Sequence, residues 1–263
     1  MERSLSGHVG RLVRIDRTKA PLRVDEKPVD AAVVCVKTHG TAWAADVAKR
    51  VLAPEGVAIT IQNGLGNYEA LVAAVGEDRA AVGVIYVGAR LDERGELHAT
   101  GPGRVELGRP RGRGSRRAFD ALAAALSSRG MTVETTDDAW PAVWRKVATN
   151  AAVNPTTALF GYTNAELLGD VAGSRVADGL AAEVAHVATA GGVAMGEDEA
   201  RRWWREMAQL TGANRSSMLQ DVQAGRSTEV DAICGAVHRE GSRRGVAAPL
   251  NQAMTVLVGA LAP

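Results

Sequence analysis

Aromatic residues, cysteines and long apolar runs are all scarce in this sequence of 263 residues. Aromatics make up 4% of it, and no apolar run approaches the roughly 18 residues that a membrane-spanning helix needs. The start, MERSLSGHVGRLVRIDR, carries charges and lacks the apolar stretch of a secretory signal. These absences argue against a membrane protein and against a secreted one.

The two cysteines, Cys35 and Cys234, stand far apart in the chain, each among apolar residues. Cysteines in such surroundings are typically buried small side chains rather than a disulfide or a metal-binding pair. Together with the missing secretory signal, this predicts a reduced, cytoplasmic protein.

Excess charge of either sign is also missing, since 31 Lys and Arg stand against 30 Asp and Glu, for a net charge of +1. The balance gives no reason to expect nucleic acid or an anionic membrane as a partner. The basic segment RPRGRGSRR (109–117) is interpreted as a solvated surface loop. Apolar residues make up 46%, enough for a sizeable core in one large or two ordinary domains.

The first half of the chain alternates strand and helix patterns. Continuous apolar runs at 31–36 and 56–62 are typical of strands buried on both faces. Helical patterns at 38–53 and 68–76 separate these strands from further ones over 79–108, which we expect to be joined by turns at Glu93–Gly95 and Gly101–Gly103. A helix at 116–130 and a strand at 131–136 follow. The alternation predicts an α/β fold with a mostly parallel, doubly wound sheet.

From about Asp137 the strand patterns stop and helical periods take over, which predicts an all-helical second domain. We therefore divide the chain into domains at 1–136 and 137–263. Thr163 and Glu166 form a capping box for the long helix that follows, and Pro249 suits the first turn of the last helix. The alanine-rich helices could also pair with a second copy as a homodimer.

One helical stripe in this second domain carries polar residues among apolar ones. Lys146, Asn150 and Asn154 fall at i, i+4 and i+8, which is one face of a helix. Burying such a stripe without partners is costly, so it is either a functional site or a solvent-facing surface. Two asparagines are unusual for an exposed face, although Asn154 precedes Pro155 and could simply end the helix.

A second candidate is Glu229, which we place in the first turn of its helix, where the positive helix end favours an ionised carboxylate. The alternative is that Glu229 only complements the helix dipole. Hydroxyl residues that can cap this helix or the preceding one are Ser216, Ser217, Ser227 and Thr228. Two nearby acids are interpreted as first-turn or surface residues: Asp221 and Asp231.

Two predicted strands end in polar residues. Lys37 follows the strand at 31–36, and Asn63 follows the strand at 56–62. Open α/β sheets bind ligands at the carboxyl ends of their strands, and the neighbouring Gly64 and Gly66 would let backbone approach a ligand closely. The pair fits a crevice for an anionic cofactor or substrate, although each residue could also be a plain turn or strand-end residue.

Taken together, four segments resemble the ketopantoate reductases (2-dehydropantoate 2-reductases), from about Val29 to the C-terminus. They are VKTHGT, QNGLGN, WRKVATNAAVNPTTAL and SSMLQDVQAGRSTEVD. The joint spacing, from Lys146 to Asn150 and from Ser217 to Glu229, agrees with the pattern of that family. The resemblance implies an incomplete Rossmann-like, dinucleotide-binding sheet followed by an all-helical substrate and catalytic domain.

The resemblance also implies roles for particular residues. Lys146 would be the general acid that protonates the C2 oxygen of a small carbonyl substrate as hydride arrives from NADPH, and Glu229 would bind the substrate hydroxyl and orient Lys146. Lys37 and Asn63 would face the cofactor. The implied substrate-binding residues are Asn150, Asn154, Asn164, Asn214 and Ser217.

One part of the family pattern is missing, namely the strand, G-x-G-x-x-G and helix that place a pyrophosphate on a helix N-terminus. Gly7 and Gly10 form GHVG without a preceding apolar strand, and Gly40 replaces a polar residue that some members use near the cofactor. Each charge-assisted backbone contact of that loop contributes about 1.5–3 kcal/mol. Losing three of them would weaken cofactor binding by roughly a thousandfold or more.

Three explanations for the missing unit are open. The sequence starts late, it binds NADPH poorly or in a rearranged way, or it kept the substrate site and dropped the redox step. We accordingly weigh three functions: an NADPH-dependent reductase of 2-dehydropantoate or a related 2-oxo acid, a cofactor-independent cyclase, lyase or isomerase, and a non-catalytic binding protein. The set of Lys146, Asn150 and Glu229 argues against the last, because a scaffold has no need of a buried lysine.

Overall fold

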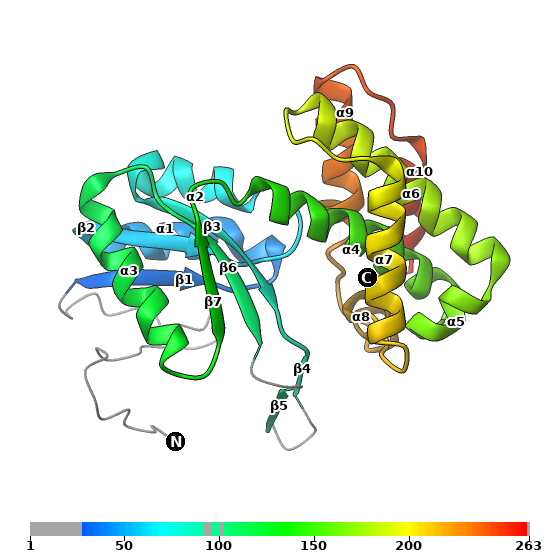
Figure 1. The fold of residues 1–263 in the computed structure, drawn as a ribbon, viewed down its shortest axis with the longest axis horizontal. Coiled ribbons are helices and arrows are strands. Elements are labelled where there is room, and N and C mark those ends of the chain that lie inside the picture. The colour runs from blue at the N-terminus through cyan, green and yellow to red at the C-terminus, as the bar shows by residue number, and fades with distance from the viewer. Residues whose placement is uncertain (1–27, 92–95, 100–102, 262–263) are drawn as a thin grey trace.

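The computed structural model describes residues 28–91, 96–99 and 103–261, in which a sheet with flanking helices is followed by a cluster of helices (Figure 1). The five-stranded sheet has the order β1-β2-β3-β6-β7. Its strands are β1 (Val29–Val34), β2 (Leu52–Thr60), β3 (Ala80–Tyr86), β6 (Arg104–Gly108) and β7 (Thr132–Thr136). A two-stranded ribbon is formed by β4 (Ala89–Leu91) and β5 (Leu97–Ala99).

The prediction of a mostly parallel sheet is confirmed. β1, β2 and β3 run parallel to one another, as do β6 and β7, whereas β3 and β6 are antiparallel. The antiparallel pair arises because the β4–β5 ribbon, rather than a crossover helix, connects β3 to β6. The turns expected at Glu93–Gly95 and Gly101–Gly103 lie wholly or mostly outside the described residues, as do Gly7 and Gly10.

Helices cover both faces of the sheet, as the doubly wound prediction requires (Figure 1). The helices α1 (Thr41–Val51) and α2 (Asn67–Val75) pack on one face, where Val34 and Ala58 are buried. The helix α3 (Arg113–Ser127) packs on the other face through Phe119, which is fully buried. The surface loop expected over 109–117 is therefore wrong for residues from Arg113 onward, since the alternation of small and charged residues there starts a helix.

Strand β1 forms one edge of the sheet, and β2 is its sole strand neighbour among the described residues. Although β1 is apolar, Val33 is 40% exposed because it lies at this edge. Cys35, just beyond β1, is exposed as well, so the prediction that it is buried is wrong, whereas Cys234 is buried as predicted.

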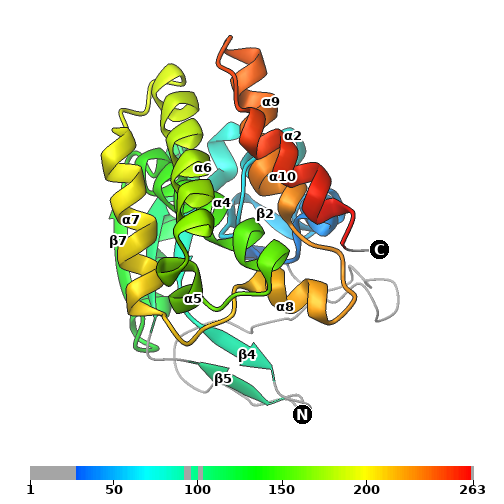
Figure 2. The same cartoon turned by 90° about the vertical axis from the view of Figure 1, so that its right-hand side faces the viewer.

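The second half is all-helical within the part of the chain that the structure describes, and the last strand, β7, ends at Thr136. Figure 2 shows its helices gathered around α4. They are α4 (Trp140–Phe160), α5 (Asn164–Gly169), α6 (Val171–Ala190), α7 (Glu197–Leu210), α8 (Ser217–Gln223), the π-helix η3 (Asp231–Gly235), α9 (Ala236–Arg243) and α10 (Pro249–Gly259). The division into domains at 136 and 137 stays a prediction.

The helix α4 continues through Pro155, so Asn154 does not end it. The ring of Pro155 removes one backbone donor from the helix. The helix persists because residues 151–158 are buried against the rest of the helical region, and the hydroxyls of Thr156 and Thr157 are satisfied within the helix by the carbonyls of Ala152 and Val153. The result is a single long helix that reaches from the sheet into the helical region (Figure 1).

Several expected helix starts are present, although Val230, rather than Ser227 or Thr228, stands at the N-terminal cap position of η3, without a side-chain cap. Thr163 and Glu166 form a capping box, but it starts the short helix α5, and Asp170 caps the long helix α6 instead. Ser216 caps α8, and Pro249 lies in the first turn of α10. None of the helices formed by the described residues is both long and apolar enough to cross a membrane.

Candidate active site

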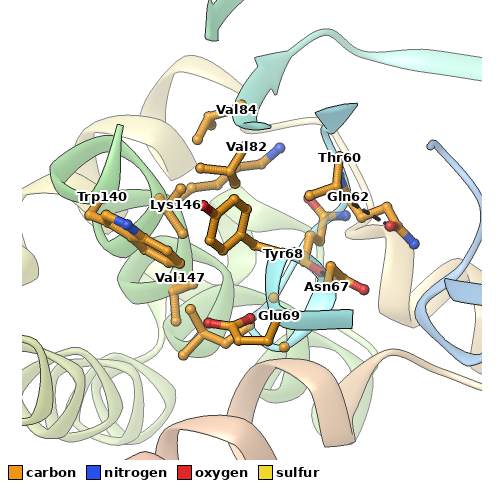
Figure 3. Close-up of a pocket in the computed structure, with 16 residues that line it drawn as sticks. Thr60, Gln62, Asn67, Tyr68, Glu69, Val82, Val84, Trp140, Lys146 and Val147 are labelled. Atoms are coloured by element: carbon orange, nitrogen blue, oxygen red, sulfur yellow. Dashed lines mark hydrogen bonds between the residues drawn. The ribbon is translucent and has the colours of Figure 1, made fainter. Parts of the chain in front are cut away.

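Two parts of the chain meet at Lys146: the sheet with its flanking helices, from β1 to β7 (the sheet region), and the helices from α4 to α10 (the helical region). This residue lies on α4, and its Nζ donates to the carbonyl oxygen of Ile85 in β3 at 2.6 Å. Figure 3 shows Lys146 on the wall of a small pocket that is closed on one side by Tyr68 and Trp140, whose rings meet edge to face with centroids 5.6 Å apart. The pocket is lined from the loop after β2, from α2, from β3 and from α4.

Burial governs the protonation of Lys146. It lowers the pKa of the Lys146 ammonium to about 8, and the negative charge of Glu229 opposes this shift. The ring of Tyr86 adds a weak favourable contact, with its centroid 5.7 Å from Nζ. A lysine in this state can release its proton near neutral pH, which an exposed lysine does not do.

Glu229 is nearly buried, with 9% of its surface exposed, and immediately precedes Val230 and η3. Its backbone carbonyl accepts from the N–H groups of Ala232 and Ile233, so it begins the helix much as expected. Its carboxylate, however, points to the sheet region. Oε1 accepts from the backbone N–H of Thr38 at 3.2 Å and from its hydroxyl at 2.9 Å, and Oε2 accepts from Asn63 Nδ2 at 3.4 Å.

Lys37 also contacts the helical region. Its Nζ lies 2.6 Å from Asp221 Oδ2 on α8 and 3.8 Å from Glu229 Oε2. Asp221 is buried, so the prediction that it is a surface acid is wrong. A partner far away in the sequence makes this burial tolerable, together with Arg226, whose Nε donates to Oδ1 at 3.0 Å. Asp231 does lie at the surface, in an ion pair with an arginine.

The glycine turn after β2 contacts protein. A Cβ on Gly64 would lie 2.4 Å from the carbonyl oxygen of Ala232, and φ at Gly64 is +82°, so another residue there would be strained. The neighbouring Leu65 N–H donates to the same oxygen at 2.9 Å. Gly66 faces open space with φ at +89°. Gly64 and Leu65 therefore pack tightly against η3, and Gly66 is the glycine of this turn that leaves room for a ligand.

The amides expected to bind substrate lie at different depths. Asn150 and Asn154 share α4 with Lys146, the first half-buried and the second buried. Asn164 is buried, and its Nδ2 donates to the hydroxyl of Thr211 at 2.8 Å. Two of the expected residues are exposed before and at the start of α8: Asn214 and Ser217. The roles of these residues stay predictions.

Three contributors to this junction were missed by sequence reasoning. Thr38 donates twice to Glu229, Asp221 binds Lys37, and the Ile85 carbonyl accepts from Lys146. A signal for Thr38 was its place directly after Lys37 at the end of a strand. Asp221 lies in the segment SSMLQDVQAGRSTEVD that carries the resemblance, but nothing local indicates its partner or marks a backbone carbonyl, because each acts on a residue far away in the sequence.

Two family models match the chain. The model described as ketopantoate reductase PanE/ApbA matches residues 5–112, and the model described as ketopantoate reductase PanE/ApbA C terminal matches residues 138–262. The first match begins ahead of β1 and of the resemblance noted from about Val29.

Similar proteins are known in archaea. A 2-dehydropantoate 2-reductase of Halobacterium salinarum is 37% identical over 229 residues, which cover 87% of this chain and 75% of that protein. One of Archaeoglobus fulgidus is 34% identical over 88% of this chain and 77% of its own length.

Solved structures with this fold carry related names. A 2-dehydropantoate 2-reductase from Geobacter metallireducens superposes with a TM-score of 0.79 at 31% identity, covering 88% of this chain and 77% of that one. A D-mandelate dehydrogenase solved with NADH and anilino(oxo)acetate gives a TM-score of 0.83 at 25% identity, covering 90% and 77%. The family models, the identities and the shared fold agree: this chain belongs to the ketopantoate reductase family.

Proposed function

We propose that this chain is an oxidoreductase that reduces the keto group of a small 2-oxo acid, 2-dehydropantoate or a relative, with NADPH. The observation that carries the proposal is the desolvated ammonium of Lys146, which binds the Ile85 carbonyl where the two regions meet and interacts electrostatically with Glu229. The names of the relatives, which are 2-dehydropantoate 2-reductases, support the reaction.

Lys146 acts as the proton donor. When bound, NADPH would supply the hydride for the keto carbon, and Lys146 Nζ would give a proton to the carbonyl oxygen, which gains negative charge and becomes a hydroxyl. The Ile85 carbonyl holds Nζ in place from the side of β3. Because burial lowers the pKa of Lys146 to about 8, the ammonium form dominates at neutral pH and still gives up its proton readily.

Glu229 and the amides position the substrate. The Glu229 carboxylate already accepts hydrogen bonds from Thr38 and Asn63, and a substrate hydroxyl would join or displace these donors. Uncharged donors on α4, on α5 and just before or at the start of α8 would bind the substrate's carboxylate and other oxygens: Asn150, Asn154, Asn164, Asn214 and Ser217.

The residues present fit one end of the cofactor. Lys37 and Asn63 follow the parallel strands β1 and β2 at their carboxyl ends, where nucleotide cofactors bind in sheets of this kind. Gly66 leaves open space beside Asn63. A related dehydrogenase was solved with NADH, which supports a nicotinamide cofactor. The described residues include no G-x-G-x-x-G loop, so the role proposed for them is limited to this end of the cofactor.

Titration with NADPH, followed by NADPH oxidation in the presence of 2-dehydropantoate, tests the proposal. We expect saturable binding and substrate-dependent loss of absorbance at 340 nm, with Lys146→Ala binding NADPH but failing to oxidise it. An absence of binding at millimolar NADPH would reject the reductase. Turnover of a carbonyl substrate without NADPH would then favour the cofactor-independent cyclase, lyase or isomerase.

The homodimer also remains a proposal. Helix α10 exposes Val256 and Leu257, at 68% and 49%, and neighbouring exposed apolar side chains are common at interfaces. Light scattering of the purified chain decides between one copy and two.

A further inference from the structure

We propose that Asp221 is a positioning residue, which acts through Lys37 to fix the strand-end segment at residues 37–40 against the helical region. The inference rests on the proposed function, because it concerns the residue that faces the cofactor. Asp221 lies on α8 in the helical region, and Lys37 follows β1 in the sheet region. Their contact at 2.6 Å therefore joins the two regions.

The two partners of Asp221 differ in kind. Arg226 belongs to the same segment as Asp221 and binds Oδ1, while its backbone N–H also donates to the Asp221 carbonyl at 2.8 Å. Arg226 thus compensates the buried charge locally. The second oxygen, Oδ2, is left for Lys37, which comes from 184 positions away in the sequence.

Lys37 needs such a partner to hold one position. Its side chain is 41% exposed, whereas that of Asp221 is 5% exposed, so the fixed member of the pair is the acid. A free lysine side chain keeps many rotamers in solvent, and ordering it on binding a ligand costs entropy. With Asp221 in place, the ammonium is ordered before the ligand arrives, 3.8 Å from Glu229 Oε2.

The effect extends to the neighbouring residue. Thr38 donates its N–H and its hydroxyl to Glu229, so the segment after β1 is fastened to two buried carboxylates in succession. Loss of Asp221 would release Lys37 and loosen Thr38, and thereby weaken the cofactor side of the site while leaving the proton donor Lys146 in place.

The test compares Asp221→Asn with the wild-type chain. Asparagine keeps the shape and removes the charge. We expect the KM for NADPH to rise about tenfold with kcat within about threefold. We also expect hydrogen exchange of the backbone amides at 38–40 to quicken about tenfold. Asp221→Glu, which restores the charge, should recover part of both effects.

Asp178→Asn is the matched control. Asp178 accepts from Arg205 and Trp204 within the helical region, so its loss should lower the melting temperature without changing the KM or the exchange at 38–40. If Asp221 has only a structural role, Asp221→Asn should likewise lower the melting temperature without changing the KM or the exchange at 38–40.

A double-mutant cycle shows whether Asp221 acts through Lys37. In a Lys37→Met background, adding Asp221→Asn should change the KM by less than about twofold. A full effect in that background, or wild-type KM and exchange in Asp221→Asn alone, would overturn the proposal. If Asp221→Asn does not fold, Lys37→Met alone must raise the KM and quicken the exchange, and wild-type values would overturn it.

The exchange measurement separates this inference from the proposed function. If the wild-type chain binds no NADPH, the proposed reductase fails, while exchange at 38–40 still shows whether Asp221 fixes the segment. If NADPH is oxidised but Asp221→Asn has the wild-type exchange and the wild-type KM, only the positioning role fails.

Discussion

The helical region and the sheet region each hold a lysine whose charge interacts with the carboxylate of Glu229, in opposite surroundings. Lys146, on α4, is half-buried with a desolvated ammonium, and its short contact is with the uncharged Ile85 carbonyl. Lys37, after β1, is 41% exposed and pairs with the buried Asp221. Burial without a close counter-charge favours release of a proton, whereas a short ion pair keeps a cation charged and in place. The helical region is thus suited to the proton transfer and the sheet region to binding.

Replacing Lys146 should have the largest effect. In Lys146→Ala the proton donor is gone, and kcat should fall by about 10³-fold, within the range of general acid catalysis. Circular dichroism should show a folded protein, because the helix keeps its buried apolar neighbours. Activity near the wild-type level would contradict the division of roles.

Replacing Lys37 should change binding instead. Lys37→Met removes the cation that pairs with Asp221, and the KM for NADPH should rise about tenfold while kcat changes little. Steady-state kinetics at varied NADPH gives both constants. A large loss of kcat at unchanged KM would mean that Lys37 takes part in the chemical step, and would contradict the assignment of binding to the sheet region.

Thr38→Val should have a smaller effect that sharpens the comparison. The variant loses the hydroxyl donor at 2.9 Å from Glu229 and keeps the backbone donor, so one of two hydrogen bonds from this residue remains. We expect kcat/KM to fall about three- to tenfold. Thr149→Val is the control and should retain wild-type kinetics, because Thr149 is a half-buried threonine on α4 whose hydroxyl donates to the Arg145 carbonyl of its own helix.

The smallest expected effect concerns stability. Lys146→Met replaces a buried cation with an apolar side chain and should stabilise the fold by about 1 kcal/mol at pH 7, a rise in melting temperature of roughly 2–4 °C. The folded-state pKa of Lys146 is lowered to about 8, so the wild-type penalty is present below that pH. It should shrink as pH rises toward the unfolded-state value of about 10.4. If thermal melts show that Lys146→Met is less stable than the wild-type chain, the interactions of the Lys146 ammonium outweigh the cost of its desolvation.

The same comparison explains what the sequence could predict. Strand and helix periods located β1, β2 and α4, and these elements set where Lys37, Asn63 and Lys146 stand. Side-chain partners were not accessible, because they depend on residues far away in the chain. Asp221 lies in a segment that carries the family resemblance, but its sequence neighbours do not show that it pairs with Lys37.

Two local patterns also misled. The Asn154–Pro155 pair is typical of a helix end, yet α4 is buried at this point and continues past it. The apolar run around Cys35 is typical of a strand buried on both faces, yet β1 lies at the edge of the sheet that the structure describes. In both cases the tertiary surroundings outweighed a local preference, and a local sequence pattern carries no information about those surroundings.

The most direct test of the central claim is the pH dependence of NADPH oxidation in a single turnover with 2-dehydropantoate. Only the ammonium form of Lys146 donates a proton, and its pKa is lowered to about 8. The rate should therefore be level below that pH and fall about tenfold per unit above it. A rate that stays level through about pH 10, where an ordinary lysine begins to lose its proton, would contradict the assignment of Lys146 as the buried proton donor.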